Sequence, residues 1–120
     1  MIGSVLNLHA LLSIQFRPAN SSYYDLEFVV DTGFTGFLTL PQNDVAALEL
    51  PLVYFTRSHL ADHSTIRLPV HEGTILWNGT ERTVNVLATG ERPLLGTALL
   101  KGNELVVQFE ESGLVTIEPL

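Results

Sequence analysis

The sequence predicts an all-β domain, closed or sandwich-like, with one or two short helices. Three observations carry this expectation. Apolar and polar residues alternate along most of the apolar stretches, which is the period of a strand with one buried face. Residues that favour turns, namely Pro, Asn, Gly and Ser, separate these stretches. Only two segments, 41–50 and 96–103, have the character of a short helix.

The first two strands are predicted by apolar residues at every second position. Alternation runs from 5 to 16, and a second set, Leu26, Phe28 and Val30, shares one face. The segment 17–22, RPANSS, lies between these runs, and its Pro, Asn and Ser residues favour a loop over continued pairing. The two runs are therefore expected to form a hairpin.

A helix and a long hairpin are expected in the middle of the chain. After a short strand at 37–40, a proline opens the helix candidate PQNDVAALEL (41–50), and Pro51 ends it. Two extended runs within 53–70 flank the polar stretch LADHS (60–64). This pattern predicts a hairpin with an exposed tip.

The following segment predicts another hairpin and a second helix. The tripeptide NGT lies between strands at 73–77 and 82–88, and Asn-Gly is a strong hairpin signal because both turn positions can take positive φ. A short helix is expected in GTALLKGN (96–103), where a glycine or asparagine stops it.

The chain ends with a strand at 104–109, a turn at EESG and a strand at 114–117. At 120 residues, the chain is long enough to bury about two thirds of the surface that its unfolded state exposes. No repeat, linker or low-complexity segment interrupts it. A single domain over 1–120 is therefore expected.

Composition narrows the possible functions. The formal charge is -7 and the six basic residues are scattered, so no basic patch is available for nucleic acid. Cysteine is absent, which excludes disulfides and thiolate chemistry. Charged residues make up only 16%, which suits a subunit that buries surface in an oligomer. The first 16 residues lack a basic leader and a long apolar span, so we expect no signal peptide, no membrane anchor and a cytoplasmic location.

The stretch VVDTGFTGFLTLP (29–41) places a carboxylate, Asp31, at the end of an apolar strand. An isolated Asp-Thr-Gly triplet is most often a turn whose carboxylate accepts hydrogen bonds from nearby backbone N–H groups. Here a second glycine and another apolar strand follow, so the triplet lies in a tight turn between two buried segments. This context favours a functional acid.

Three features, in this order and spacing, resemble the aspartic peptidases, specifically the single-domain retroviral-type (retropepsin-like) branch with its bacterial members. They are the strand followed by Asp31-Thr32-Gly33, a flap-like hairpin around LADHS, and Leu94-Leu95-Gly96 before a short helix. The resemblance extends over nearly all of the chain. It implies a closed retropepsin-like acid-protease barrel with a flap hairpin, assembled as a homodimer.

The resemblance implies an aspartic endopeptidase that uses neither a cofactor nor a metal. In this family two aspartates hold one water: an ionised carboxylate removes its proton while a protonated partner hydrogen-bonds the scissile carbonyl. Two carboxylates held about 3 Å apart share a proton and titrate as a unit. The chain has one Asp-Thr-Gly, so the second acid is expected to be Asp31 of an identical subunit, with peptide or protein as substrate.

The resemblance also assigns roles around Asp31. Gly33 would let the backbone approach the carboxylates, and Thr32 would hydrogen-bond the active-site loop of the other subunit. Further support of this loop is expected from Thr35, Leu95 and Gly96. The expected substrate contacts are Phe34, Leu60, Ala61, Asp62, His63 and Ser64. The end segments 1–4 and 114–120 are candidates for the dimer interface, beside the active-site loops.

Other chemistry has weaker support in the sequence. His59 and His63 flank Asp62, but positions four apart on an extended strand are roughly 13 Å apart, too far to share a metal ion unless the turn brings them together. Solvated flap residues are the simpler interpretation. His9 and His71 are expected to be structural or exposed. With no cysteine and no G-x-S-x-G, a serine or cysteine nucleophile is unsupported.

A second function remains open. The chain could be a catalytically weak or inactive module of the same fold that binds or dimerises, because a fold does not guarantee its chemistry. Two departures from the family pattern favour this alternative. Phe34 stands where relatives often have Ala or Ser, and the flap tip is Asp62-His63 instead of a glycine-rich turn.

Overall fold

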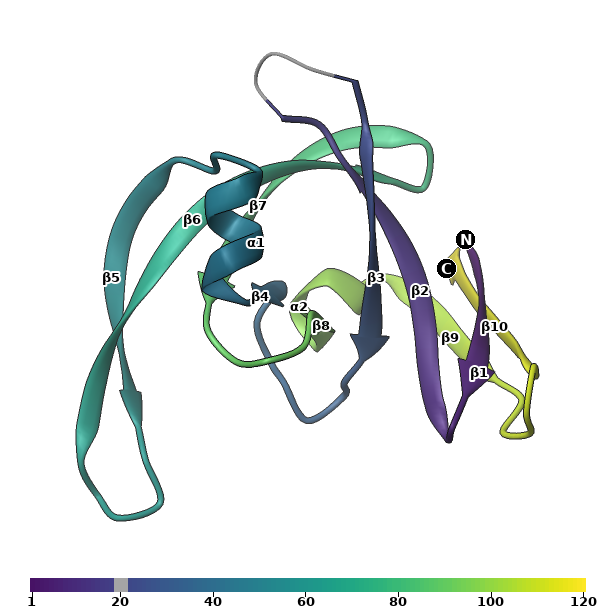
Figure 1. Cartoon of the computed structure of the whole chain (residues 1–120). Coiled ribbons are helices and arrows are strands. Elements are labelled where there is room, and N and C mark those ends of the chain that lie inside the picture. The colour runs from purple at the N-terminus through teal and green to yellow at the C-terminus, as the bar shows by residue number, and fades with distance from the viewer. Residues whose placement is uncertain (19–21) are drawn as a thin grey trace.

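The structure, a computed structural model, describes residues 1–18 and 22–120. It is built mostly of strands, with two short helices, as the sequence predicts. In chain order the elements are β1 (Ile2–Leu6), β2 (His9–Phe16), β3 (Tyr24–Val30), β4 (Leu38–Leu40), α1 (Gln42–Ala47), β5 (Leu52–His59), β6 (Thr65–Trp77), β7 (Thr80–Ala88), β8 (Leu94–Leu95), α2 (Thr97–Leu100), β9 (Asn103–Val107) and β10 (Leu114–Pro119) (Figure 1).

The strands form one curved sheet in the order β5-β6-β7-β4-β8-β3-β2-β1-β10-β9. A further pairing of Phe16 in β2 with Ile75 in β6 joins the two sides of its central part. Figure 1 shows the β5–β6 hairpin as an arm on one side of this body and β1, β9 and β10 on the other side. Neither helix of the described residues is long enough to cross a membrane.

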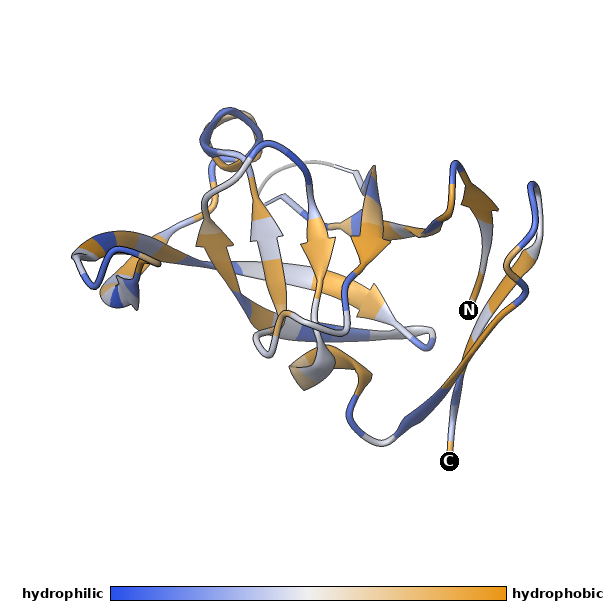
Figure 2. Ribbon diagram, turned by 90° about the horizontal axis from the view of Figure 1, so that it is seen from below, coloured by the Kyte–Doolittle hydropathy of each residue, from blue (hydrophilic) through white to orange (hydrophobic). Residues whose placement is uncertain are grey.

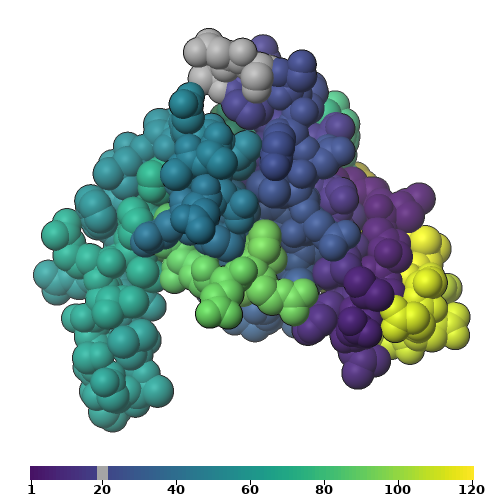
Figure 3. Space-filling model, in the orientation of Figure 1, coloured from purple at the N-terminus to yellow at the C-terminus, as the bar shows by residue number. Residues whose placement is uncertain are grey.

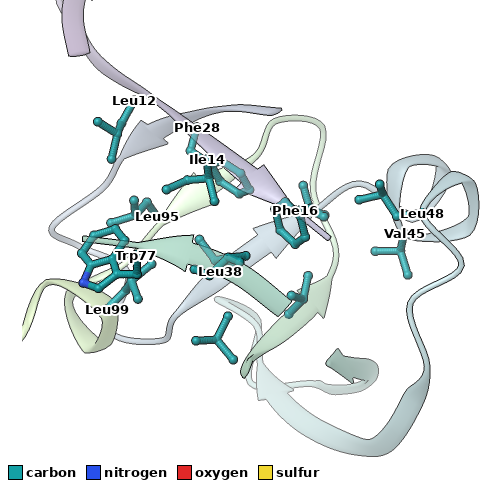
Figure 4. Close-up of a cluster of buried hydrophobic side chains, with 14 of the residues drawn as sticks. Leu12, Ile14, Phe16, Phe28, Leu38, Val45, Leu48, Trp77, Leu95 and Leu99 are labelled. Carbon is teal, nitrogen blue, oxygen red and sulfur yellow. The ribbon is translucent and has the colours of Figure 1, made fainter. Parts of the chain in front are cut away.

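The core lies inside the curved sheet because alternate side chains of each strand point inward. In β2, Ile14 and Phe16 are fully buried while Ser13 and Gln15 are exposed. The Phe16 ring stacks on Phe28 with 5.9 Å between centroids. Figure 4 shows these rings among aliphatic side chains from several elements, including Leu12, Leu38, Val45, Leu48, Leu95 and Leu99.

The two helices close opposite sides of the strands (Figure 2). From α1 and the residue that follows it, Val45 and Leu48 pack into the core. From α2, Leu99 and Leu100 do the same. Each helix is too short to be stable alone, so this packing is what holds it in place.

One parallel and one antiparallel pairing bring distant segments to the end of β3. Val29 and Val30 pair with Leu94 and Leu95 of β8, and β8 pairs on its other side with β4. A strand of two residues has little stability of its own, so its neighbours on both sides determine its place. This arrangement puts the Leu94-Leu95-Gly96 segment directly beside the turn that contains Asp31.

Several predicted boundaries were wrong. The alternation over 5–16 is not one strand, because a tight turn at Asn7 and Leu8, with φ of 49° and 65°, separates β1 from β2. The first helix ends at Ala47, and Glu49 then takes a φ of 53°, so the chain leaves the helix before Pro51. The predicted strand at 104–109 ends at Val107, and β8 was not predicted.

Both hairpins predicted from turn residues are confirmed. Pairing of β2 with β3 extends to Phe16 and Tyr24, although residues 19–21 of the predicted loop lie outside the described residues. At the second hairpin, Asn78 and Gly79 have φ of 52° and 80°, as an Asn-Gly turn requires, and β6 and β7 pair up to Trp77 and Thr80.

Candidate active site

Asp31 lies in a turn directly after β3, and hydrogen bonds fix both its backbone and its side chain. Its N–H donates to the carbonyl of Leu95 (2.9 Å), and its carbonyl accepts from the N–H of Phe34 (3.1 Å). Its Oδ1 atom accepts from the N–H of Gly33 (2.9 Å). The side chain is half-buried, so the carboxylate is oriented by its own turn and still reaches the surface.

Gly33 stands where a side chain would press on this carboxylate. A Cβ atom built there would lie 3.2 Å from Oδ1 of Asp31, closer than ordinary van der Waals contact. A substitution would push the carboxylate or the turn aside. The geometry therefore gives a local reason for glycine at this position, independent of any partner.

The start of α2 is hydrogen-bonded to the loop after Asp31. The N–H of Gly96 donates to the Phe37 carbonyl (2.9 Å), that of Thr97 to the Phe34 carbonyl (2.8 Å) and that of Ala98 to the Gly36 carbonyl (3.1 Å). Leu95, just before, is fully buried. These bonds use N–H groups that a helix start leaves without partners, and they tie the helix to the candidate site.

Phe34, expected to contact substrate, is half-buried, and its ring lies against two glycines of its own chain. A Cβ atom built on Gly36 would be 2.6 Å from Cζ of the ring, and one built on Gly96 would be 2.5 Å from Cδ2. The ring therefore fills space that both glycines leave open. The sequence did not predict this contact. Contact of Phe34 with a peptide stays a prediction.

The two threonines of the loop point outward. Thr32 and Thr35 are exposed, and neither hydroxyl forms a hydrogen bond within the described residues. An exposed hydroxyl on the outside of the loop is free to bond another chain. The roles expected for Thr32 and Thr35 stay predictions.

The β5–β6 hairpin carries the flap-tip residues, all of them exposed. The N–H of Leu60 donates to the Ser64 carbonyl (2.9 Å), and His63 takes a φ of 68°. Asp62 Oδ1 accepts hydrogen bonds from the Ser64 hydroxyl (2.5 Å) and N–H (3.0 Å), which lower the pKa of the Asp62 carboxyl. The tip thus forms a hydrogen-bonded turn although it contains no glycine.

Figure 1 shows that several turns and loops extend toward the same side of the molecule. These are the flap tip, the loop 31–37, and the β1–β2 and β9–β10 turns. Figure 3 shows an open bay between the flap (teal) and the rest of the chain, bordered by green atoms of the segment around residue 90. A hollow of about 470 Å³ lies at this border, lined by Leu68 of the flap, by Thr89 to Glu91 and by the start of α1.

The terminal strands, expected at a dimer interface, pair within the chain. β1 lies between β2 and β10, and β10 lies between β1 and β9. The Met1 ammonium donates to the Ile117 carbonyl (2.7 Å), and the Ile117 N–H donates to the Met1 carbonyl (2.9 Å). Both edges of β1 and β10 are therefore occupied. An interface at these strands stays a prediction, and the edge open to a partner at this end of the sheet is that of β9.

The histidines do not form a cluster. His71 makes a hydrogen bond of 2.8 Å with the Leu50 carbonyl through Nδ1, and His9 Nε2 lies 3.2 Å from the guanidinium of Arg92. Across residues 1–18 and 22–120, no three His, Asp or Glu side chains are grouped so that they could hold a metal ion.

Comparison with known proteins supports the fold. The chain is similar to the crystal structure of a retropepsin-like aspartic protease from Rickettsia conorii, with a TM-score of 0.61 and 15% sequence identity, over 100% of this chain and 90% of the other. No protein-family model matches the sequence. No curated protein matches it either. The likeness is one of fold, and this fold is retropepsin-like.

Proposed function

We propose that the protein is an aspartic endopeptidase that works as a homodimer, with one Asp31 from each subunit. The observation that carries this proposal is the placement of Asp31. It directly follows β3 in a retropepsin-like fold, with its carboxylate oriented by Gly33 and its backbone bonded to Leu95. The bond to Leu95 continues the pairing of β3 with β8, so it fixes where the acid stands at the end of the strand.

In the proposed mechanism, two Asp31 carboxylates hold one water and share one proton. The ionised carboxylate removes a proton from the water as it attacks the scissile carbonyl carbon, while the protonated carboxyl donates to the carbonyl oxygen. The proton taken from the water then passes to the leaving nitrogen as the C–N bond breaks, and the proton on the former carbonyl oxygen returns to a carboxylate, so the pair again shares one proton. Because a single chain has one Asp31 at this position, the dimer is part of the chemistry.

The parts around Asp31 fit this use. The exposed Thr32 hydroxyl would bond the loop of the second subunit. The flap would close over an extended peptide, add backbone hydrogen bonds and limit water. The bay seen in Figure 3 would then be filled from the other side by the partner.

The test is cleavage of a diverse peptide pool by the wild type and by Asp31→Asn, followed by mass spectrometry. Asn keeps the shape of the side chain and removes the ionisable group, so we expect cleavage to be abolished while the thermal stability stays near that of the wild type. Cleavage at acid to mildly acid pH should fall as the pH rises, because both carboxylates then ionise. Equal cleavage by the two proteins would refute the mechanism.

Dimerisation is tested separately by light scattering at micromolar concentrations. A dimer that binds peptides but cleaves none would instead identify the protein as a binding or dimerisation module.

A further inference from the structure

Arg92 lies on the same face of the sheet as Asp31. Directly paired residues of neighbouring strands share a face, and Leu94 pairs with Val29, which pairs with Leu11. Asp31, two residues after Val29, continues this outer face. Arg92 lies in the bend before β8, and its contact with His9 at the start of β2 places its guanidinium on this side. The opposite face carries the core residue Phe28.

The side chain of Arg92 crosses β3 on this face. β8 and β2 lie on opposite sides of β3, yet the Arg92 guanidinium is 3.2 Å from Nε2 of His9 at the start of β2. Continuing the β2–β3 register by two residues brings His9 level with Asp31. The guanidinium therefore lies one strand away from the candidate catalytic acid.

This cation has no carboxylate partner within the described part of the chain. The ion pair there joins Arg17 to Glu81, at 2.8 Å. Arg92 forms none, although Glu91 precedes it and Glu27 lies on β3. Glu91 lines the hollow beside Leu68 of the flap hairpin. A guanidinium can only donate hydrogen bonds, so Arg92 donates one N–H to the lone pair of the His9 imidazole. This contact orients the guanidinium and leaves its other N–H groups available.

From this arrangement we infer that Arg92, oriented by His9, binds an acidic side chain of the peptide near the cleaved bond. The inference rests on the proposed endopeptidase function. An extended peptide whose carbonyl reaches Asp31 would lie along this outer face, where the Arg92 guanidinium, held beside His9, is one strand spacing of about 5 Å from the strand that leads to Asp31. The chain has a net charge of -7, so a general attraction to acidic peptides is absent and selectivity for them must come from a local cation.

The test uses pairs of peptides that differ only by Glu or Gln near the cleaved bond, all amidated so that no terminal carboxylate competes. For the wild type, kcat/KM should favour Glu over Gln by about tenfold. Arg92→Gln should reduce this ratio to about one, chiefly by lowering kcat/KM for the Glu peptide. Arg92→Glu should favour a Lys peptide. Lys101→Gln makes the same change of net charge away from this face and should keep the wild-type ratio.

Binding to the Asp31→Asn protein separates this inference from the proposed function. We expect Asp31→Asn to bind the Glu peptide more tightly than the Gln peptide, and the double variant Asp31→Asn with Arg92→Gln to bind both equally. This result would support recognition by Arg92 even if the wild type cleaves nothing. Asp31-dependent cleavage with equal use of Glu and Gln would overturn the inference and keep the enzyme. Conversion of the dimer to a monomer by Arg92→Gln, measured by light scattering, would also overturn it, since the cation would then serve the partner subunit.

Discussion

The contact of Phe34 with Gly36 predicts a strong coupling between these two positions. A Cβ atom on Gly36 would lie 2.6 Å from Cζ and 2.8 Å from Cε1 of the ring, and carbon atoms at rest are about 3.5–4.0 Å apart. The ring would have to move by about 1 Å, but its other side lies against Gly96. Gly36→Ala should therefore destabilise the protein by about 2 kcal/mol, the usual cost of overpacking.

Removing the ring should remove this cost. The three atoms nearest to a Cβ on Gly36 all belong to Phe34, and Gly36 does not have a positive φ. In the Phe34→Ala background, Gly36→Ala should therefore be neutral, or stabilising by about 0.5 kcal/mol because alanine restricts the unfolded chain. Phe34→Ala alone should cost about 2 kcal/mol, less than a fully buried ring, because Phe34 is half-buried.

The assay is urea unfolding of the four proteins, followed by the fluorescence of Trp77, the single tryptophan. Stability of a dimer depends on protein concentration, so all four proteins are compared at two fixed concentrations. The expected coupling energy is about 2 kcal/mol in favour of the double variant. An equal cost of Gly36→Ala with and without Phe34 would show that the ring does not lie on this glycine.

Three further predictions concern the same loop and the flap. Gly96→Ala should lower the stability by about 3 kcal/mol, or the Tm by about 12 °C. Phe34→Ala should not restore this stability, because the new Cβ on residue 96 would also meet the backbone carbonyl oxygens of Gly36 and Phe34. Restored stability in a thermal melt would contradict this prediction. The Leu94 amide donates a hydrogen bond to the Thr39 hydroxyl (3.1 Å), so Thr39→Val should speed the hydrogen exchange of this amide, whereas Thr39→Ser should preserve its protection. Equal exchange rates in the two variants would be evidence against the bond. The Asp62 carboxyl should titrate by NMR with a pKa below that of an ordinary aspartate, because the hydroxyl and the N–H of Ser64 both favour the ionised form. Ser64→Ala removes the hydroxyl bond and keeps the N–H bond, so the midpoint should move up, and an unmoved midpoint would argue against the hydroxyl bond. The stabilisation from these bonds is present above the usual carboxyl pKa and is lost as the pH falls through the lowered one.

The fold class could be predicted because strand alternation and turn residues are local signals. The dipeptide Asn78-Gly79 was enough to predict its hairpin, since such residues take positive φ easily. The turn at Asn7 and Leu8 has no such signal. Leucine rarely takes a φ of 65°, and apolar alternation continues through the turn, so the sequence predicted one strand where two exist.

In the candidate site too, local contacts could be predicted from the sequence and long-range contacts could not. Asp31 and Gly33 stand in one short motif, and their mutual contact is local. The ring of Phe34 rests on Gly96, sixty-two positions away, and β8 exists because β3 and β4 lie on either side of it. Likewise, no pattern in the sequence links Arg92 to His9. Contacts of this kind depend on the register of the sheet, which the spacing of residues alone does not determine.

The parallel pairing of β3 with β8 also sets when the site can exist during synthesis. Asp31 emerges from the ribosome early, but its backbone partner, Leu95, follows sixty-four residues later. At about 5–20 residues per second, this delay lasts several seconds. Until then the nascent chain carries the acid in a segment without its bracing strand. A chain built this way cannot complete the backbone contacts around Asp31 until most of it has been translated.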